Sequence, residues 1–306
     1  MTDSFKSKIN LLPDTVKGVL LALVSTALFV TVGVLVRILS ERIDVFQILF
    51  FRQLVFITVL LPAMRNNIKT LMRPRSVKLH LLRVTGAFCA LSLGFITVSN
   101  MPLAEATTLG FTKVLFVALI SSTFLSESIN SSRKFTLLVG FLGVMLVVQP
   151  SFDNMVITYS LTGLGAALGA AVAVICVRKI TQTEPTITLL AYQAIFVGAL
   201  ALIPAIVNWQ WPTMVELMLL LSVGGISSVA QWIGVTAYKY GEANVVANVE
   251  YAKMIYSLIL GYYIFSELPD IISLTGASLI LASVFLPHFL MKLAKRVRKT
   301  PLSENT

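Results

Sequence analysis

Long apolar runs, separated by short polar or charged segments, account for most of this chain. A helix needs about 20 mostly apolar residues to cross the roughly 30 Å hydrocarbon core of a bilayer. The runs are continuous and do not alternate in hydrophobicity, which favours helices over the strands of a membrane barrel. The pattern therefore predicts an all-α integral membrane protein with ten transmembrane helices, at residues 16–36, 45–63, 79–99, 103–124, 135–150, 157–177, 186–207, 214–237, 244–265 and 271–291.

The composition supports a membrane protein and excludes several other classes. Hydrophobic residues make up 57% of the 306 residues and charged residues only 12%, about half the share found in a soluble domain. Such a chain is neither a soluble enzyme, nor a disordered protein, nor a collagen-like fibre. Cys89 and Cys176 lie inside apolar runs, and the sequence shows no nucleotide-binding loop, metal-ligand cluster or catalytic triad pattern. We therefore expect neither enzyme activity nor a bound cofactor or metal.

The distribution of positive charge predicts the orientation in the membrane. Four of the 24 Lys and Arg residues lie within spans. With the N-terminus inside, only Arg37 and Arg42 of the others lie outside. Residues 1–15 and 292–306 then form cytoplasmic tails of a multi-pass protein in the cytoplasmic (inner) membrane. This topology and the anionic lipids of the inner leaflet explain the net charge of +10, so no nucleic acid partner is expected.

An internal repeat relates the two halves of the chain. Each half holds five predicted spans, and an odd number of spans turns the second copy upside down in the membrane. We therefore predict two inverted five-helix repeats, at 16–150 and 157–291, with a substrate site near the midplane between them. Equivalent residues of the two halves are Gly94 and Gly234, Lys113 and Lys253, Ser126 and Ser266, Glu127 and Glu267, and Pro62 and Pro204.

Short motifs surround the fourth and ninth predicted spans. The first half carries Ala-Glu-Ala-Thr at 104–107, Phe-Thr-Lys-Val-Leu-Phe at 111–116 and Leu-Ser-Glu at 125–127, followed by Gly140 and Gly143. The second half carries Glu-Ala-Asn at 242–244, Glu-Tyr-Ala-Lys at 250–253, Phe-Ser-Glu at 265–267 and Gly276. Through these motifs, nearly the whole chain resembles the EamA-type ten-span carriers of the drug/metabolite transporter superfamily. The resemblance implies transport of a small organic molecule, because members carry amino acids, nucleotide-like cofactors, riboflavin or drugs. Many members have a proline near the middle of the fourth and ninth helices, where Val114 and Met254 stand here.

Two lysines and a glutamate are the leading candidates for the substrate site. Lys113 lies roughly 15 Å into the fourth span, and Lys253 at the equivalent place in the ninth, too deep to snorkel to water. Facing one cavity, the two lysines would bind an anionic or zwitterionic substrate; the alternative is a structural ion pair with a carboxylate. Glu250, three residues before Lys253, either neutralises that lysine or carries a coupling proton.

Other polar residues in the spans have both a functional and a structural interpretation. Arg52, in mid-span, either faces the cavity or pairs with a carboxylate, because arginine stays ionised when partly buried. Arg83, one turn inside the third span, is expected to snorkel to the cytoplasm. Glu105 either gates the site or stabilises a helix N-terminus. Glu127 and Glu267 either close two gates on opposite faces or end their helices in solvent.

Three aromatic residues, Trp232, Tyr192 and Tyr251, lie deep enough to stack on a flat substrate, although core packing produces the same pattern. The sequence therefore predicts a secondary active transporter of a small anionic or zwitterionic organic metabolite, such as an amino acid or a cofactor-like molecule. The metabolite would cross the cytoplasmic membrane by alternating access of the transporter, with a proton or a counter-substrate as coupling partner. The alternative, a lipid scramblase or channel, requires a continuous polar stripe along one helix face, which the spans do not show.

Overall fold

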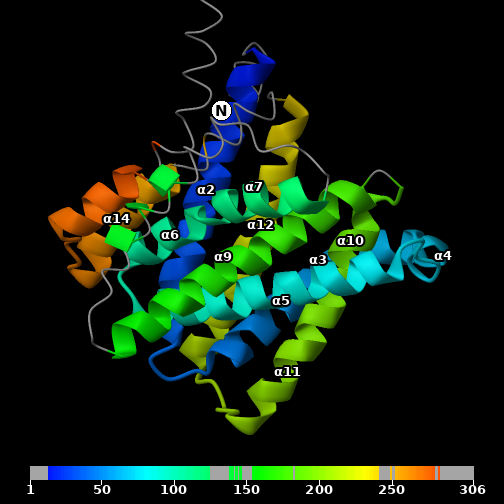
Figure 1. Ribbon diagram of the computed structural model, residues 1–306. Coiled ribbons are helices and arrows are strands. Elements are labelled where there is room, and N and C mark those ends of the chain that lie inside the picture. The colour runs from blue at the N-terminus through cyan, green and yellow to red at the C-terminus, as the bar shows by residue number, and fades with distance from the viewer. Residues whose placement is uncertain are drawn as a thin grey trace, which may run out of the picture.

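The computed structural model describes residues 13–124, 138–140, 142–143, 145–146, 154–181, 183–240, 249, 252–279 and 282. These residues form helices joined by turns, and no strand occurs among them. Residues 271–279 are helical. The labelled elements of Figure 1 are α2 (Asp14–Leu39), α3 (Val45–Asn66), α4 (Ile68–Leu71), α5 (Val77–Asn100), α6 (Leu103–Phe111), α7 (Lys113–Phe124), α9 (Asn154–Ile180), α10 (Thr186–Tyr192), the π-helix η1 (Gln193–Val197), α11 (Gly198–Val207), α12 (Met214–Tyr240) and α14 (Ala252–Phe265).

Six helical segments among the described residues are long and apolar enough to cross a membrane. Large apolar side chains on their outer faces are exposed, among them Leu20, Val59, Leu161 and Ile203, as expected where a helix meets lipid. These segments correspond to the first, second, third, sixth, seventh and eighth predicted spans and confirm an all-helical, multi-pass membrane protein. They are Val16–Leu39, Val45–Asn66, Val77–Asn100, Ile157–Val177, Thr186–Val207 and Met214–Gly234.

The fourth predicted span, 103–124, is not one continuous helix as expected. It divides into α6 and α7 at Thr112, whose hydroxyl donates a hydrogen bond to the Leu109 carbonyl oxygen at 2.7 Å. The Thr112 N–H also donates to the Leu109 carbonyl oxygen, at 3.0 Å, and this bond over three residues makes a tight 3₁₀-type turn here without a proline. Much of the predicted spans 135–150 and 271–291 lies outside the described residues, and of the ninth span the structure describes the apolar helix Ala252–Phe265.

Two helix pairs join the first half of the chain to the second. α5 runs beside α9, and α12 packs on α2 (Figure 1). At the α5–α9 contact the backbones nearly touch: a Cβ atom on Gly86 would lie 2.8 Å from the Gly169 carbonyl oxygen, and one on Gly169 would lie 2.7 Å from that of Gly86. Small residues allow membrane helices to approach this closely. The two halves are therefore packed into one body through these glycines.

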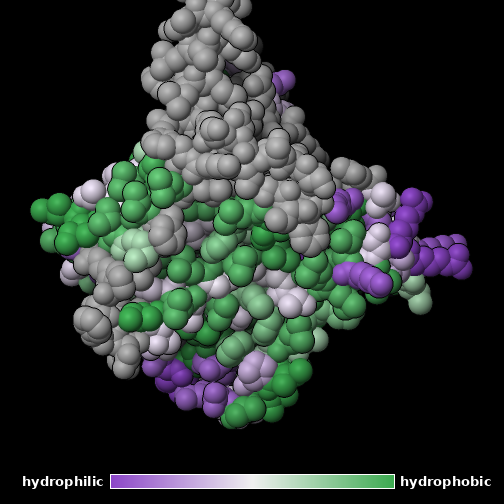
Figure 2. Space-filling view, viewed as in Figure 1, coloured by the Kyte–Doolittle hydropathy of each residue, from purple (hydrophilic) through white to green (hydrophobic). Residues whose placement is uncertain are grey.

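The remaining helices surround these pairs. α3 packs against α11, η1 and α12, and α6 packs against α14. Figure 2 shows hydrophobic side chains across the middle of one face, with hydrophilic ones gathered around α4 and along the lower edge. This distribution fits a protein whose middle lies in lipid and whose edges meet water.

Candidate functional site

Arg52 lies in the middle of α3, on the side that packs against α12. The helix begins after Asp44, whose carboxylate accepts a hydrogen bond from the Phe46 N–H at 2.8 Å. Arg52 is only 6% exposed; its Nε donates to the Ser227 hydroxyl at 3.1 Å, and its Nη1 has no partner among the described residues. Within the same part of the chain, no carboxylate forms an ion pair with it. Since a buried charge without a counter-charge is unfavourable, this position is suited to hold an anionic group.

Gln53 adds a second buried polar group beside Arg52. It is fully buried, and neither its amide oxygen nor its amide nitrogen has a partner among the residues that the structure describes. Its stem packs on α11, where a Cβ atom on Gly198 would lie 3.2 Å from the Gln53 Cβ. The sequence gives only a weak signal for this residue, a glutamine next to an arginine in mid-span.

Lys113 and Lys253 are both partly buried. Lys113 is the first residue of α7, and the Lys253 Nζ lies 5.7 Å from the centroid of the Phe29 ring on α2. The helices α6 and α14 touch, with the hydroxyl groups of Thr107 and Ser257 2.6 Å apart. The structure thus brings the equivalent segments of the two halves together. That the two ammonium groups share one cavity stays a prediction.

Glu267 connects three segments at the end of α14. Its carboxylate forms an ion pair with Arg37 of α2 and accepts a hydrogen bond from the Leu103 N–H of α6 at 2.9 Å. Arg37 also donates to the Met101 carbonyl oxygen at 3.1 Å. Ser266, with a φ of 55°, turns the chain so that Glu267 reaches these groups. Only 15% of the Glu267 side chain is exposed, which does not fit a solvated helix end and suits a contact that holds three helices together.

The aromatic candidates lie in two separate places. Tyr192, at the end of α10, donates its hydroxyl to the Leu71 carbonyl oxygen at 2.6 Å, and its ring centroid is 4.7 Å from that of His80. Trp232 on α12 is 71% exposed. Tyr192 therefore packs beside the α4–α5 turn, while Trp232 stands on the outer surface of its helix. The structure does not bring these two rings together.

The acidic candidates are only partly covered by the structure. Glu105 lies in the first turn of α6, is partly buried and accepts a hydrogen bond from Ser273. This position fits the interpretation of a carboxylate at a helix N-terminus as well as that of a gate. Glu127, Glu250 and Tyr251 lie outside the described residues, so their predicted roles stay predictions.

The expectation that Arg83 snorkels to the cytoplasm is wrong. Arg83 is 5% exposed; its Nη1 donates to the Leu189 carbonyl oxygen at 2.7 Å and its Nη2 to the Gln193 side-chain oxygen at 2.9 Å. One turn earlier, the His80 Nε2 lies 2.9 Å from a buried carboxylate oxygen of Glu184. Acceptors on α10 and η1 therefore hold Arg83 inside the protein, and they are more than a hundred residues away in the sequence.

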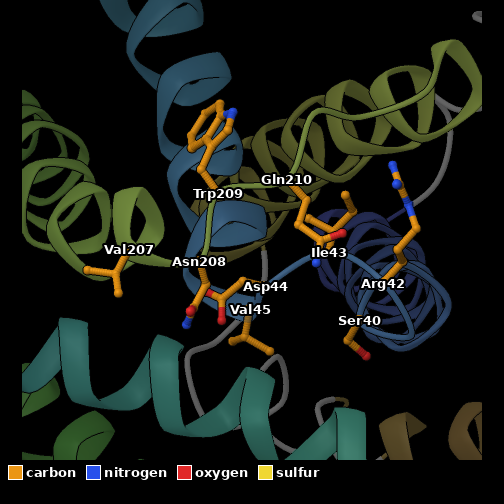
Figure 3. Close-up of a pocket in the computed structure, with 9 residues that line it drawn as sticks. All are labelled: Ser40, Arg42, Ile43, Asp44, Val45, Val207, Asn208, Trp209 and Gln210. Atoms are coloured by element: carbon orange, nitrogen blue, oxygen red, sulfur yellow. The ribbon is translucent and has the colours of Figure 1, made fainter.

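A cavity of about 470 Å³ lies between the α2–α3 turn and the α11–α12 connection (Figure 3). The residues that line it include Arg42, Asp44, Asn208 and Gln210. Arg42 is fixed by Glu216, whose two carboxylate oxygens lie 2.5 Å from its Nε and Nη2. These hydrogen bonds raise the pKa of the Arg42 guanidinium above its usual value. The cavity is polar and open to the surface, and it is separate from Arg52 and the lysines.

A smaller cavity of about 180 Å³ lies between α5, α6 and α9. Glycine and alanine residues make up most of its wall, together with Thr97 and Val98. Gly110, which also lines it, is one helical turn before Lys113. This cavity therefore adjoins the α6–α7 turn at the predicted site.

Comparison with known proteins adds independent information. The chain matches the model of the EamA-like transporter family twice, over residues 16–149 and 157–287. It is 31% identical to an S-adenosylmethionine uptake transporter of Rickettsia bellii, over 87% of this chain and 91% of the relative. It is 30% identical to a pseudopaline exporter of Pseudomonas aeruginosa, over 87% of this chain and 94% of the relative.

Two further proteins are similar to this chain. A riboflavin transporter of Vibrio cholerae is 28% identical, over 79% of this chain and 82% of the relative. A protein solved by crystallography superposes with a TM-score of 0.63 over 92% of this chain and 99% of that chain, at 18% identity. At this identity the structural likeness supports the fold alone.

Proposed function

The chain belongs to the EamA-like transporter family, and from this premise we propose that it carries a small anionic or zwitterionic organic metabolite by alternating access. It is a multi-pass membrane transporter, and we place it in the cytoplasmic membrane. Its relatives are named for the uptake of S-adenosylmethionine, the export of pseudopaline and the transport of riboflavin. These names support a small metabolite as the cargo here, and the direction of transport is a matter for experiment.

The proposed architecture is two inverted five-helix repeats with both termini in the cytoplasm. The family model matches each half once, which supports the repeat. The contacts between the halves support it too, because they occur in equivalent pairs. The α5–α9 contact has its equivalent in the α12–α2 contact, and the α3–α12 contact has its equivalent in the η1–α5 contact. In transporters of this design the substrate site lies near the midplane, between the repeats.

The buried charge of Arg52 is the observation that carries the proposed substrate class. A carboxylate or phosphate group of the substrate would supply the counter-charge that the described residues do not, and a guanidinium binds such groups with two parallel hydrogen bonds. The amide of Gln53 offers a further donor and acceptor. Lys113 and Lys253 would add positive charge from the other helices that meet at the centre.

Carboxylates are the proposed gating and coupling groups. Glu267 would close one side of the membrane through its ion pair with Arg37. Glu127 is its equivalent in the repeat and is proposed for the other side. Glu250 is proposed either to carry the coupling proton or to neutralise Lys253, since the two are one helical turn apart in the sequence.

Counterflow in proteoliposomes tests both the activity and the role of Arg52. Vesicles preloaded with an unlabelled compound are supplied with trace amounts of its labelled form, from a panel of amino acids, nucleotides and vitamins. For a compound that is exchanged, Arg52→Met should reduce counterflow by at least about tenfold, because loss of a charged hydrogen bond in a dry site weakens binding strongly. Arg65→Met, at the exposed end of the same helix, is the matched control and should leave exchange unchanged.

Two results would contradict the proposal. Exchange of cationic compounds alone would reverse the assigned substrate class. Full exchange of an anionic compound by a well-folded Arg52→Met variant would remove Arg52 from the site.

A further inference from the structure

The seventh predicted span contains a π-helix that α3, its equivalent in the first half, does not have. η1 stands between α10 and α11, whereas α3 is an α-helix throughout. A π-turn spans one residue more than a turn of the α-helix, so η1 holds an extra residue that the regular helix α3 lacks. A π-turn accommodates an extra residue of this kind within a helix.

Arg83 of α5 binds the start of this inserted turn. Its Nη1 donates to the Leu189 carbonyl oxygen, which also accepts the N–H of Gln193, the first residue of η1. Its Nη2 donates to the Gln193 side chain. Because Arg83 is 5% exposed, water does not compete for these two hydrogen bonds, and the guanidinium fixes the position of the turn.

The other end of η1 leads to the candidate substrate site. η1 contacts both α5 and α3, and Gly198, which follows it directly, packs on Gln53. Gln53 is next to Arg52, whose Nε is bonded to Ser227 of α12. A continuous series of contacts therefore runs from Arg83 through η1 to the Arg52–Ser227 pair.

We propose that Arg83 is a positioning residue. By holding the extra residue of η1 as a π-turn, Arg83 keeps α11 packed on Gln53. It thereby keeps Arg52 hydrogen-bonded to Ser227 and both residues buried. This inference rests on the proposed function in one respect: the Arg52–Ser227 pair is taken as the substrate site. Without the guanidinium the inserted turn loses two side-chain hydrogen bonds, so it should open more often and expose Ser227.

Cysteine labelling of the full-length protein in proteoliposomes tests this without any substrate. In a background with alanine in place of Cys89 and Cys176, Ser227→Cys reports on the buried pair, and Ser222→Cys, exposed on the same helix, is the matched control. We expect Arg83→Met to raise the rate of labelling by methyl methanethiosulfonate about tenfold at position 227 and to leave position 222 within about twofold.

A deletion provides the rescue that a merely structural arginine would not show. Removing Ala194 together with Arg83→Met takes the extra residue out of η1. The span can then form a regular α-helix that needs no arginine. Labelling at position 227 should then return to within about twofold of the parent rate. Deletion of Leu54 from the regular helix α3 is the control and should prevent folding, because it rotates all later residues by about 100°.

An unchanged labelling rate at position 227 in Arg83→Met overturns the proposal. So does a failure of the Ala194 deletion to slow labelling again. If labelling becomes faster at both positions 227 and 222, the variant is generally unfolded, and Arg83→Lys, which keeps the charge but has a single donor nitrogen, decides. Faster labelling at 227 alone supports the proposal, and faster labelling at both positions refutes it. These outcomes do not depend on transport, so a failure of the counterflow assay is distinguished from a failure here.

Discussion

Gly86 is a position where a single methyl group should clearly disturb this protein. In Gly86→Ala the new Cβ would lie 2.8 Å from the Gly169 carbonyl oxygen, 3.1 Å from the Ala173 nitrogen and 3.3 Å from the Val172 Cβ. Two of these atoms belong to the backbone of α9 and cannot turn away as a flexible side chain would. α5 and α9 must therefore separate, and with them the two halves of the chain.

The size of the effect follows from two opposing contributions. Overpacking in a tight interface costs about 1–3 kcal/mol, whereas alanine is favoured over glycine inside a helix by about 0.5–1 kcal/mol. For Gly86→Ala we expect a net loss of about 1–2 kcal/mol, or about a 5- to 30-fold lower folding equilibrium constant. Gly225→Ala on α12 isolates the helix contribution and should stabilise the protein, because no atom of the other described segments lies within 4 Å of the new Cβ.

Unfolding in mixed micelles measures both variants. The protein is titrated with sodium dodecyl sulfate, and the fluorescence of its three tryptophans reports the unfolded fraction. Gly86→Ala and Gly225→Ala should shift the midpoint in opposite directions. A Gly86→Ala variant as stable as Gly225→Ala would refute the close approach of α5 and α9.

Substitutions at three glutamates test two contacts of the structure and the predicted role of Glu250. Glu267→Gln keeps an acceptor for the Leu103 N–H but removes the ion pair, so its melting temperature in micelles should fall less than that of Glu267→Ala; equal falls would show that this hydrogen bond contributes nothing. Glu184→Ala leaves His80 and two backbone N–H groups without their acceptor and should destabilise the protein by about 1–3 kcal/mol in the same micelle titration, with Glu184→Gln closer to the parent. If Glu250 carries a proton, Glu250→Gln should abolish uptake driven by a pH gradient in proteoliposomes while counterflow persists; loss of both would make it a counter-charge instead.

Hydropathy was sufficient to locate six spans, because burial in lipid demands long apolar runs whatever the helices pack against. It could not reveal the turn at Thr112. The run from 103 to 124 is mostly apolar, with Glu105 and Lys113 as its charged residues, and the turn is a single N–H bond over three residues at Thr112. A local change in backbone hydrogen bonding of this kind leaves the hydrophobic pattern unchanged.

The buried polar residues show the same limit. Arg52 attracted attention from the sequence because a charge in mid-span is unusual. Arg83 appeared close enough to water to snorkel, and only its acceptors on α10 and η1 explain why it stays inside. Gln53 has no charge and drew no attention, although its lack of partners in the described part of the chain makes it as notable as Arg52. For both arginines the hydrogen-bond partners come from a distant part of the chain.

The turn at Thr112 also determines how the fourth span can change shape. A bend made by proline is permanent, since proline has no N–H with which to close the helix. At Thr112 the amide hydrogen is present and donates to the Leu109 carbonyl oxygen at 3.0 Å, and the Thr112 carbonyl oxygen accepts from Phe116 at 3.1 Å. Straightening the span would therefore exchange hydrogen bonds rather than break a covalent constraint, at a free energy on the order of one hydrogen bond, about 0.5–1.5 kcal/mol. We expect the thickness of the surrounding bilayer to change how readily the span straightens.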